Sequence, residues 1–404
     1  MKRTRLPMLA VLPVTVIASV IAVPFVLGDH PLRWESGSLV PNLVINEETS
    51  TSDQSPDTGG DSASPVVELA KVEKEWKEGM PQWGVQLYWE DHAASTEYIK
   101  KQARIQANYL VGLHANSVSI SFPFATGGRA STEISASDKT PSPQRMADVL
   151  AIFHQAGLRT TVRPLLDETS LDVDNGDWRG NIEPSDPDAW FTSYEKFLTP
   201  YLREAEAQKA ATFVIGTELN SMEGSPGWDS LVDRAEQLFS GEVAYDANWD
   251  AYVAGPVNMP VTNLGIDAYF PVKVPDTASV ETLAEGWNEW LDKKATGPLP
   301  KITIAEAGIG AMDGAYQAPG DFYTKRAVNP KVQANWYTAV CQVVQERQMS
   351  GVYWWSIYFD DDPNTKPDDE KQSRLDFAGR PQTEKAITAC FTSDYAGPGV
   401  DDAS

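Results

Sequence analysis

The chain has 404 residues, 42% of them hydrophobic, which is enough to bury one large core or two modest ones. Its 33 basic and 57 acidic residues give a formal net charge of −24, which argues against nucleic acid as a partner because nothing neutralises the phosphates. A neutral or cationic ligand fits this charge. Thirteen Trp and 14 Tyr are more than such a core needs. Aromatic rings stack on sugar faces, although composition alone favours ordinary core packing.

Residues 1–28 are predicted to be a signal peptide or an N-terminal membrane anchor. Lys2, Arg3 and Arg5 precede an uncharged stretch from Leu6 to Leu27, a pattern typical of an export signal. The stretch is long enough to span a bilayer, and no Ala-x-Ala cleavage site closes it. An anchor is therefore preferred over a cleaved signal peptide. Both interpretations place the protein outside the cytoplasm.

The rest of the chain divides into three predicted regions. Residues 29–65 are expected to form a flexible linker, because Asn46–Pro65 is rich in Ser, Thr, Asp, Gly and Pro and holds no large apolar residue. Residues 66–391 have the composition of one globular domain. Residues 392–404 are expected to form a flexible C-terminal tail.

Eight runs typical of β-strands alternate with helical patterns across the globular region. The runs are Trp83–Trp89, Ser117–Phe122, Leu158–Pro164, Ala211–Thr217, Glu242–Tyr245, Leu264–Phe270, Ile302–Ala305 and Val352–Tyr358. The helical patterns are Ala93–Leu110, Ser142–Ala156, Asp188–Gln208, Trp228–Phe239, Ser279–Leu291, Asn329–Arg347 and Gln382–Cys390. This alternation predicts an α/β fold, a (β/α)₈ TIM barrel. A doubly wound sheet is the alternative, but no glycine-rich phosphate turn follows the first strand.

No metal or cofactor site is predicted. Cys341 and Cys390 form no Cys-x-x-Cys motif, and the four His include no His-Glu-x-x-His motif. The acidic runs 360–362 and 368–370 offer oxygen ligands for Ca²⁺, but their spacing matches no calcium loop, so a solvated loop is preferred. If the chain is exported, a disulfide between the two cysteines and a pair of buried thiols are equal alternatives.

Two of the strand-like runs lead into a glutamate, Glu218 after Ala211–Thr217 and Glu306 after Ile302–Ala305. Burying a carboxylate is costly, so such a group must be paired or used. The C-terminal ends of barrel strands converge on one face, which brings both glutamates to a single cleft. Two facing carboxyl groups are what glycoside hydrolysis requires. A surface salt bridge is an equal alternative for either glutamate alone, and the pair is the more specific signal.

Five motifs follow one another at the expected strand ends. They are Ile215-Gly216-Thr217-Glu218-Leu219, Tyr245-Asp246-Ala247-Asn248-Trp249-Asp250, Gly265-Ile266-Asp267-Ala268-Tyr269-Phe270-Pro271, Ile304-Ala305-Glu306-Ala307-Gly308 and Gly351-Val352-Tyr353-Trp354-Trp355. Together they resemble glycoside hydrolase family 113, a clan A family whose known members are retaining β-mannanases. The resemblance spans about Trp83 to Thr388.

This resemblance implies roles for individual residues. It makes Glu218 the general acid/base and Glu306 the nucleophile. Tyr269 matches the tyrosine that hydrogen-bonds the nucleophile, with an ordinary core tyrosine as the alternative. Trp354 or Trp355 matches the tryptophan that floors the sugar subsite beside the scissile bond. Neighbouring strand residues point to opposite faces, so only one of the two can do this, and Trp355 is preferred.

One position departs from the clan pattern. The clan usually has Asn immediately before the acid/base, where it hydrogen-bonds the sugar 2-hydroxyl, and here this position is Thr217. A hydroxyl can make one such bond but lacks the reach of the amide, which leaves the sugar preference open.

Further candidates follow from their places at the strand ends alone. They are expected to line the cleft and to contact sugar, with a loop or salt-bridge role as an equal alternative. These candidates are Trp89, Glu90, Arg163, Asp167, Asn248 and Trp249. Glu223, five residues after the predicted acid/base, is expected to face solvent.

The sequence therefore predicts a monomeric, extracytoplasmic glycosidase that is tethered to a membrane only through its N-terminal segment. Its expected partner is a β-linked neutral glycan such as β-1,4-mannan, and it needs no cofactor. Another clan A specificity, such as a β-glucanase, is the first alternative. A non-catalytic barrel that binds cell-surface glycan is the second, although such a protein has no need for both glutamates.

Overall fold

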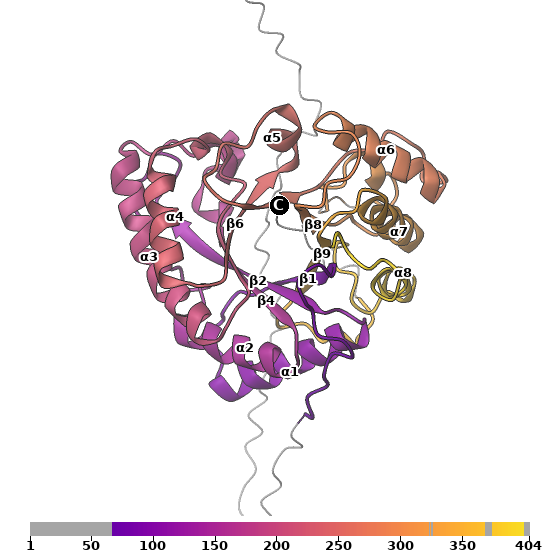
Figure 1. Cartoon of the computed structure of the whole chain (residues 1–404), viewed down its shortest axis with the longest axis horizontal. Coiled ribbons are helices and arrows are strands. Elements are labelled where there is room, and N and C mark those ends of the chain that lie inside the picture. The colour runs from indigo at the N-terminus through magenta and orange to yellow at the C-terminus, as the bar shows by residue number, and fades with distance from the viewer. Residues whose placement is uncertain (1–66, 323, 325, 368–373, 400–404) are drawn as a thin grey trace, which may run out of the picture.

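The computed structural model describes residues 67–322, 324, 326–367 and 374–399, which form a closed barrel surrounded by helices (Figure 1). Strand β1 (Gln82–Tyr88) pairs in parallel with both β2 (Ser117–Thr126) and β9 (Gly351–Tyr358), so the sheet closes on itself. The intervening strands are β4 (Arg159–Leu166), β5 (Thr212–Thr217), β6 (Glu242–Asn248), β7 (Asn263–Asp267) and β8 (Ile302–Ala307). The predicted α/β class and (β/α)₈ TIM barrel are confirmed.

Seven helices connect successive strands or close the chain on the outside of the barrel (Figure 1). They are α1 (Thr96–Gly112), α2 (Pro143–Gln155), α3 (Pro187–Ala207), α4 (Gly227–Leu238), α6 (Val280–Asp292), α7 (Pro330–Glu346) and α8 (Pro381–Phe391). Four of them begin at a side chain that accepts a hydrogen bond from the backbone N–H three residues on, a common N-cap. These caps are Ser95, Ser142, Asp186 and Ser279.

Several short elements are absent from the sequence prediction. Strand β3 (Ile134–Ser135) pairs antiparallel with the end of β2, and helix α5 (Trp249–Ala254) follows β6 directly. Five single 3₁₀ turns complete the described part of the chain. They are η1 (Glu168–Ser170), η2 (Val173–Asn175), η3 (Arg179–Asn181), η4 (Asn220–Met222) and η5 (Ala315–Gln317).

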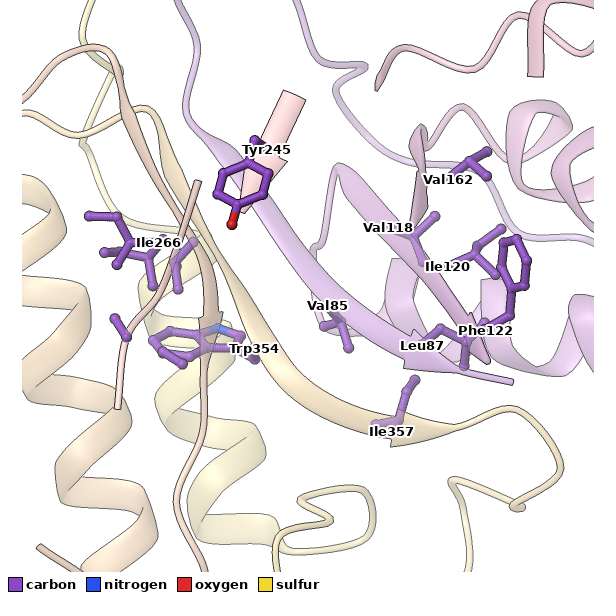
Figure 2. Close-up of a cluster of buried hydrophobic side chains, with 14 of the residues drawn as sticks. Val85, Leu87, Val118, Ile120, Phe122, Val162, Tyr245, Ile266, Trp354 and Ile357 are labelled. Carbon is purple, nitrogen blue, oxygen red and sulfur yellow. The ribbon is translucent and has the colours of Figure 1, made fainter. Parts of the chain in front are cut away.

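The apolar core lies between the strands and the outer helices. Figure 2 shows part of it, including Val85 and Leu87 from β1 and Val118 and Ile120 from β2. Because side chains alternate along a strand, the residues between them point into the barrel. Many of these inward residues are polar: Gln86 accepts a hydrogen bond from the Ser121 hydroxyl at 3.0 Å across the barrel interior. The interior therefore carries polar chemistry, and the outer layer carries the apolar packing.

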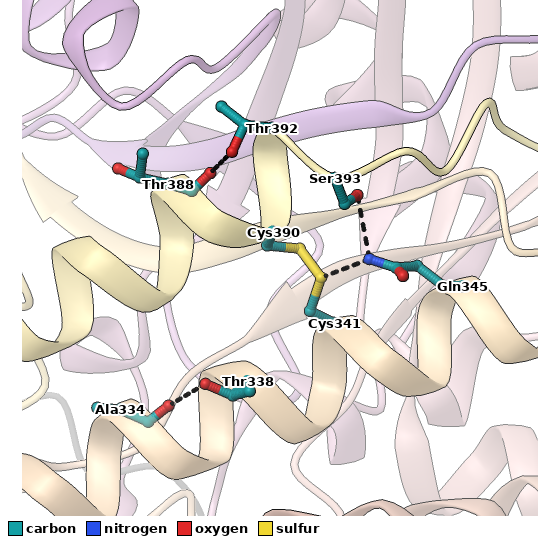
Figure 3. The surroundings of a disulfide bond; sticks show 8 residues. All are labelled: Ala334, Thr338, Cys341, Gln345, Thr388, Cys390, Thr392 and Ser393. Carbon is teal, nitrogen blue, oxygen red and sulfur yellow. Dashed lines mark hydrogen bonds between the residues drawn. A yellow bond between two sulfur atoms is a disulfide. The ribbon is translucent and has the colours of Figure 1, made fainter.

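One disulfide joins the last two helices (Figure 3). Cys341 of α7 and Cys390 of α8 are bonded, with 5.8 Å between their Cα atoms, which decides between the two alternatives left by the sequence. Gln345 supports the site, because its side-chain amide donates to Cys341 Sγ and to Ser393 Oγ, each at 3.1 Å. The bond closes a loop of 49 residues between helices that pack side by side.

The chain beyond α8 packs against the start of the barrel. The Tyr395 hydroxyl donates to the Met349 carbonyl at 2.7 Å, and its ring lies 5.9 Å from that of Trp83. The Gly399 amide donates to the Gly79 carbonyl at 3.2 Å. Residues 392–399, which were predicted to be a flexible tail, therefore lie against the barrel.

Some sequence predictions fall on parts of the chain that the structure does not describe. Regions 1–28 and 29–65, the acidic run 368–370 and residues 400–404 lie outside the described residues. Among the residues that are described, no helix is both long and apolar enough to cross a membrane. The same residues contain no group of three or more His, Cys, Asp or Glu side chains that could hold a metal ion.

The disulfide gives a prediction about stability. Replacing Cys341 and Cys390 together by Ser should lower the free energy of unfolding by about 2–4 kcal/mol, because the unfolded chain regains the entropy of the open loop. Urea unfolding followed by circular dichroism measures this difference, and the wild type with dithiothreitol should lose a similar amount. Equal unfolding midpoints for wild type and variant under oxidising conditions would contradict the prediction.

Candidate active site

The two predicted catalytic glutamates occupy the C-terminal ends of non-adjacent strands. Glu218 directly follows β5 and Glu306 lies near the end of β8. Both side chains are buried, with residue exposures of 1% and 4%. Glu218 has a φ of 54°, in the left-handed region that residues other than glycine rarely adopt. Such strain is concentrated at functional sites, where the surrounding structure holds it in place.

Both carboxylate oxygens of Glu306 are engaged. The Tyr269 hydroxyl donates to Oε2 at 2.6 Å, and Arg163 Nη1 lies 2.6 Å from Oε1. The structure therefore places two of the sequence candidates, Tyr269 and Arg163, in contact with the predicted nucleophile. A carboxylate held on both oxygens has a fixed orientation, which is what attack on one carbon atom requires.

Arg163 from β4 is the centre of a buried charge cluster. Its Nε lies 2.6 Å from Asp246 Oδ2, and its Nη2 lies 2.9 Å from Asp267 Oδ2. Burial alone would lower the pKa of Arg163, but the carboxylates of Asp267, Glu306 and Asp246 raise it well above its usual value. Burial raises the pKa of Asp267 well above its usual range, with Arg163 opposing and Glu306 adding to the rise. The cluster therefore holds a fixed guanidinium in contact with three buried carboxyl groups.

Glu218 lies in a different environment. Its Oε2 is 3.1 Å from Nη1 of Arg179, which is on the long loop between β4 and α3. Burial raises the pKa of Glu218 to about 8, opposed by Arg179 and reinforced by the charges of Glu306 and Glu168. Glu218 is thus a carboxylic acid at neutral pH, the state that a general acid needs.

The two neighbouring tryptophans of β9 face opposite sides of the strand. Trp354 belongs to the outer core (Figure 2), where it stacks on Tyr337 with 4.5 Å between ring centroids. Trp355 belongs to a second apolar cluster inside the barrel mouth, and the Arg163 guanidinium carbon lies 5.8 Å from its ring centre. The other members of this cluster are Tyr88, Leu165, Tyr269, Phe322 and Leu375. Trp354 therefore cannot floor a sugar subsite, whereas Trp355 lies on the inner side.

The remaining predicted cleft residues are distributed more widely. Trp89 stacks on Phe359 in the outer core at 4.7 Å, so the prediction that it lines the cleft is wrong. Asn248 is the N-cap of α5, where its side chain accepts from the Asp250 amide. Trp249 packs between the outer core and the inner cluster, which leaves it partly exposed at the barrel mouth.

Four polar residues that the sequence singled out have local partners or are buried. Glu90 pairs with Lys139 at 3.0 Å, and Asp167 caps η1. Thr217 is buried, and its hydroxyl has no hydrogen-bond partner among the described residues. Glu223 accepts a hydrogen bond from the Tyr245 hydroxyl at 2.9 Å and is half-buried, so the expectation that it faces solvent is wrong.

Sequence reasoning overlooked four charged residues of the site. Asp246 and Asp267 lie on inward positions within two of the quoted motifs, and reading the alternation of side chains along β6 and β7 would have found them. Glu168 and Arg179 come from an irregular loop, where no periodicity marks a residue as inward.

A separate cavity of about 400 Å³ opens at the other end of the barrel. It is lined by residues at the beginnings of strands, including Gln82, Thr212, Glu242 and Asn263, and it extends inward to Asp246. Catalytic sites of TIM barrels lie at the C-terminal ends of the strands. We therefore assign the site to the end that carries Glu218 and Glu306.

A barrel with two buried glutamates at the C-terminal ends of its strands has the carboxyl groups that glycoside hydrolysis requires. The family model described as Glycoside Hydrolase Family 113 matches residues 87–376, more than half of the chain, and the protein belongs to that family. No curated protein matches the sequence.

Solved structures with the same fold include two relatives from this family. A structure titled "Structure of GH113 beta-1,4-mannanase" is 19% identical, with a TM-score of 0.63, covering 78% of this chain and 100% of that one. The GH113 β-mannanase AaManA from Alicyclobacillus acidocaldarius, in complex with ManMIm, is 18% identical with a TM-score of 0.60, covering 81% and 99%. An FMN-binding β-glucuronidase from Facaelibacterium prausnitzii L2-6 is 10% identical with a TM-score of 0.51, covering 81% and 46%. At these identities the likeness establishes the fold.

The Arg163 cluster gives a prediction. Replacing Arg163 by Met should lower the free energy of unfolding by about 3–5 kcal/mol, because buried carboxyl groups lose their only close cation among the described residues. The matched control is Arg129→Met, whose side chain is 45% exposed and pairs with Glu183 at the surface. The control should change stability by about 0.5 kcal/mol or less. Urea unfolding of both variants decides, and similar losses in the two would contradict the prediction.

Proposed function

We propose that the protein is a retaining glycosidase that cleaves β-1,4-mannan or manno-oligosaccharides by double displacement. The observation that carries the proposal is the contrast between two carboxyl groups in one buried site. Glu218 has a pKa raised to about 8 by burial, whereas Glu306 is held by a guanidinium and a phenol. A pair of carboxyl groups in contrasting environments is how one site supplies both an acid and a nucleophile.

In the first step, the carboxylic acid of Glu218 donates its proton to the glycosidic oxygen as the bond to the anomeric carbon breaks. Glu306 attacks that carbon and forms a glycosyl ester. The ester is neutral, so one charge that raises the pKa of Glu218 disappears and the pKa falls. In the second step, Glu218 takes a proton from water, the water oxygen attacks the anomeric carbon, and Glu306 leaves as a carboxylate.

The proposed substrate rests on three observations. The chain belongs to family 113, and two solved structures with its fold are titled β-mannanases. The net charge of −24 disfavours polyanionic glycans. The inner aromatic cluster around Trp355 offers a surface for stacking on a sugar ring. Thr217, in place of the Asn that is usual in the clan, leaves the sugar preference open, so a β-glucanase stays the second candidate.

We place this activity outside the cytoplasm, in a monomer that works without a cofactor and is tethered through its N-terminal segment. The uncharged stretch Leu6–Leu27 after three basic residues supports export. The Cys341–Cys390 disulfide supports the same location, because such bonds persist in oxidising compartments.

Substitution of Glu306 tests the nucleophile. Glu306→Ala should abolish turnover of an aryl β-mannoside, because the glycosyl ester cannot form. Added azide should restore turnover and give the α-mannosyl azide, which NMR of the product identifies. The control Glu183→Ala removes a surface carboxylate from the same face of the barrel and should keep wild-type activity. A Glu306→Ala variant that hydrolyses the substrate at the wild-type rate would rule out the assignment.

Substitution of Glu218 tests the acid/base. Glu218→Ala should lose about 10²–10⁴-fold in kcat on manno-oligosaccharides, whose leaving groups need a proton. It should lose far less in the first step with dinitrophenyl mannoside, whose leaving group departs unprotonated. Steady-state and burst kinetics on both substrates measure the contrast, and equal losses on the two would refute the role.

A panel of oligosaccharides tests the substrate. β-1,4-Manno-oligosaccharides should give the highest kcat/KM, with β-1,4-gluco- and xylo-oligosaccharides well below. Product analysis by chromatography supplies the rates. A preference for the gluco series would replace mannan by the second candidate, and binding without cleavage of any of them would remove the enzymatic proposal.

A further inference from the structure

The loop between β4 and α3 brings two charged side chains into the site that the mechanism above does not use. Glu168 belongs to η1 and Arg179 to η3, and each residue is only 1% exposed. Arg179 Nη2 lies 3.5 Å from Glu168 Oε1. Because burying charge is costly unless it is paired, a loop that inserts both groups into the barrel mouth calls for a functional explanation.

Arg179 is held in place by contacts that do not involve Glu218. Its Nε donates to the Leu166 carbonyl at the end of β4, at 3.2 Å. The loop itself is fixed to the segment that follows Glu218, because the Ser221 hydroxyl donates to the Ile182 carbonyl at 2.5 Å. The guanidinium therefore approaches Glu218 from a fixed direction.

That direction makes the two oxygens of Glu218 different. Oε2 lies 3.1 Å from Arg179 Nη1, whereas Oε1 has no hydrogen-bond partner among the described residues. A proton on Oε2 would be repelled by the adjacent guanidinium N–H groups. The proton of the acid therefore belongs on Oε1, which is the oxygen left available to a leaving group.

We propose that Arg179 is a positioning residue: its guanidinium pairs with Oε2 of Glu218, so that the proton of the acid lies on Oε1. The neighbouring carboxyl group of Glu168 weakens this effect of Arg179. The inference deepens the function proposed above and rests on it. When Oε1 gives its proton to the glycosidic oxygen, the carboxylate left behind is paired with Arg179. When water attacks in the second step, its proton returns to Oε1, and Arg179 keeps its own protons throughout.

The charge balance around Glu218 supports this role. Arg163, the other cation that acts on Glu218, is already in contact with three carboxyl groups. Titratable groups from the elements around Glu218 interact with it electrostatically. They are Arg163 from β4, Glu168 and Arg179 from the following loop, Tyr245 from β6, Asp267 and Tyr269 from β7 and its end, and Glu306 from β8. Arg179 lowers the pKa of Glu218 and Glu168 raises it, so their removal has opposite consequences.

The test measures the pKa of Glu218 directly, without substrate. The side-chain carboxyl signal of Glu218 is followed by ¹³C NMR in glutamate-labelled protein and assigned by its loss in Glu218→Gln. In Arg179→Met the pKa should rise by about 1–3, the usual effect of losing an adjacent opposite charge. In Glu168→Gln it should fall, because the guanidinium then serves Glu218 alone. The control is Arg129→Met, which removes the surface ion pairs of Arg129 with Asp177 and Glu183 on the same loop. It should leave the pKa of Glu218 unchanged.

If the loop has only a structural role, the two substitutions should not change the pKa of Glu218 in opposite directions. An unchanged pKa in folded Arg179→Met, or displacement in the same direction in both variants, would overturn the proposal. If Arg179→Met does not fold, Glu168→Gln decides alone, and a pKa that does not fall overturns it. A wild-type protein that hydrolyses no glycoside would remove the proposed function and leave this titration interpretable.

Discussion

The interaction on which the site depends is the burial of charge at the C-terminal end of the barrel. Two guanidiniums hold five carboxyl groups there, each paired through at least one close contact. They are Arg163 and Arg179 with Glu168, Glu218, Asp246, Asp267 and Glu306. Moving one such ion out of water costs several kcal/mol, so the arrangement persists only because the pairs satisfy one another. The apolar packing between strands and helices stabilises the fold and offsets this cost.

Because carboxyl groups outnumber guanidiniums in the site, the carboxyl groups differ in protonation state. Five acids cannot all be ionised beside two cations in a buried site, so some must keep their protons. Burial raises the pKa of Glu218, Asp246 and Asp267, and Arg163 contacts Asp246, Asp267 and Glu306. The same shortage of positive charge that makes the cluster costly therefore leaves Glu218 protonated at neutral pH.

The sequence predicts the barrel because strand-like and helical patterns alternate along the chain. It predicts the two glutamates because each stands at the end of a strand-like run. Strands β5 and β8 are largely apolar runs, and Glu218 and Glu306 stand at their ends. Strand β6 was predicted only to Tyr245 and extends to Asn248, because its inward Asp246 and Asn248 break the apolar pattern that marks a strand. Glu168 and Arg179 could not be found in this way, because an irregular loop has no period from which burial follows.

The Thr at position 217, where the clan usually has Asn, and the β4–α3 loop affect the same part of the site. In the clan, an amide beside the acid/base contributes donors at this end of the site, and here a buried hydroxyl without a partner among the described residues stands there instead. Buried polar groups are normally hydrogen-bonded, so this hydroxyl is an exception in the site. The loop contributes a guanidinium close by, with more N–H donors than an amide and a permanent charge. The part of the site around Glu218 is therefore organised from the β4–α3 loop as well as from the strand that leads into Glu218.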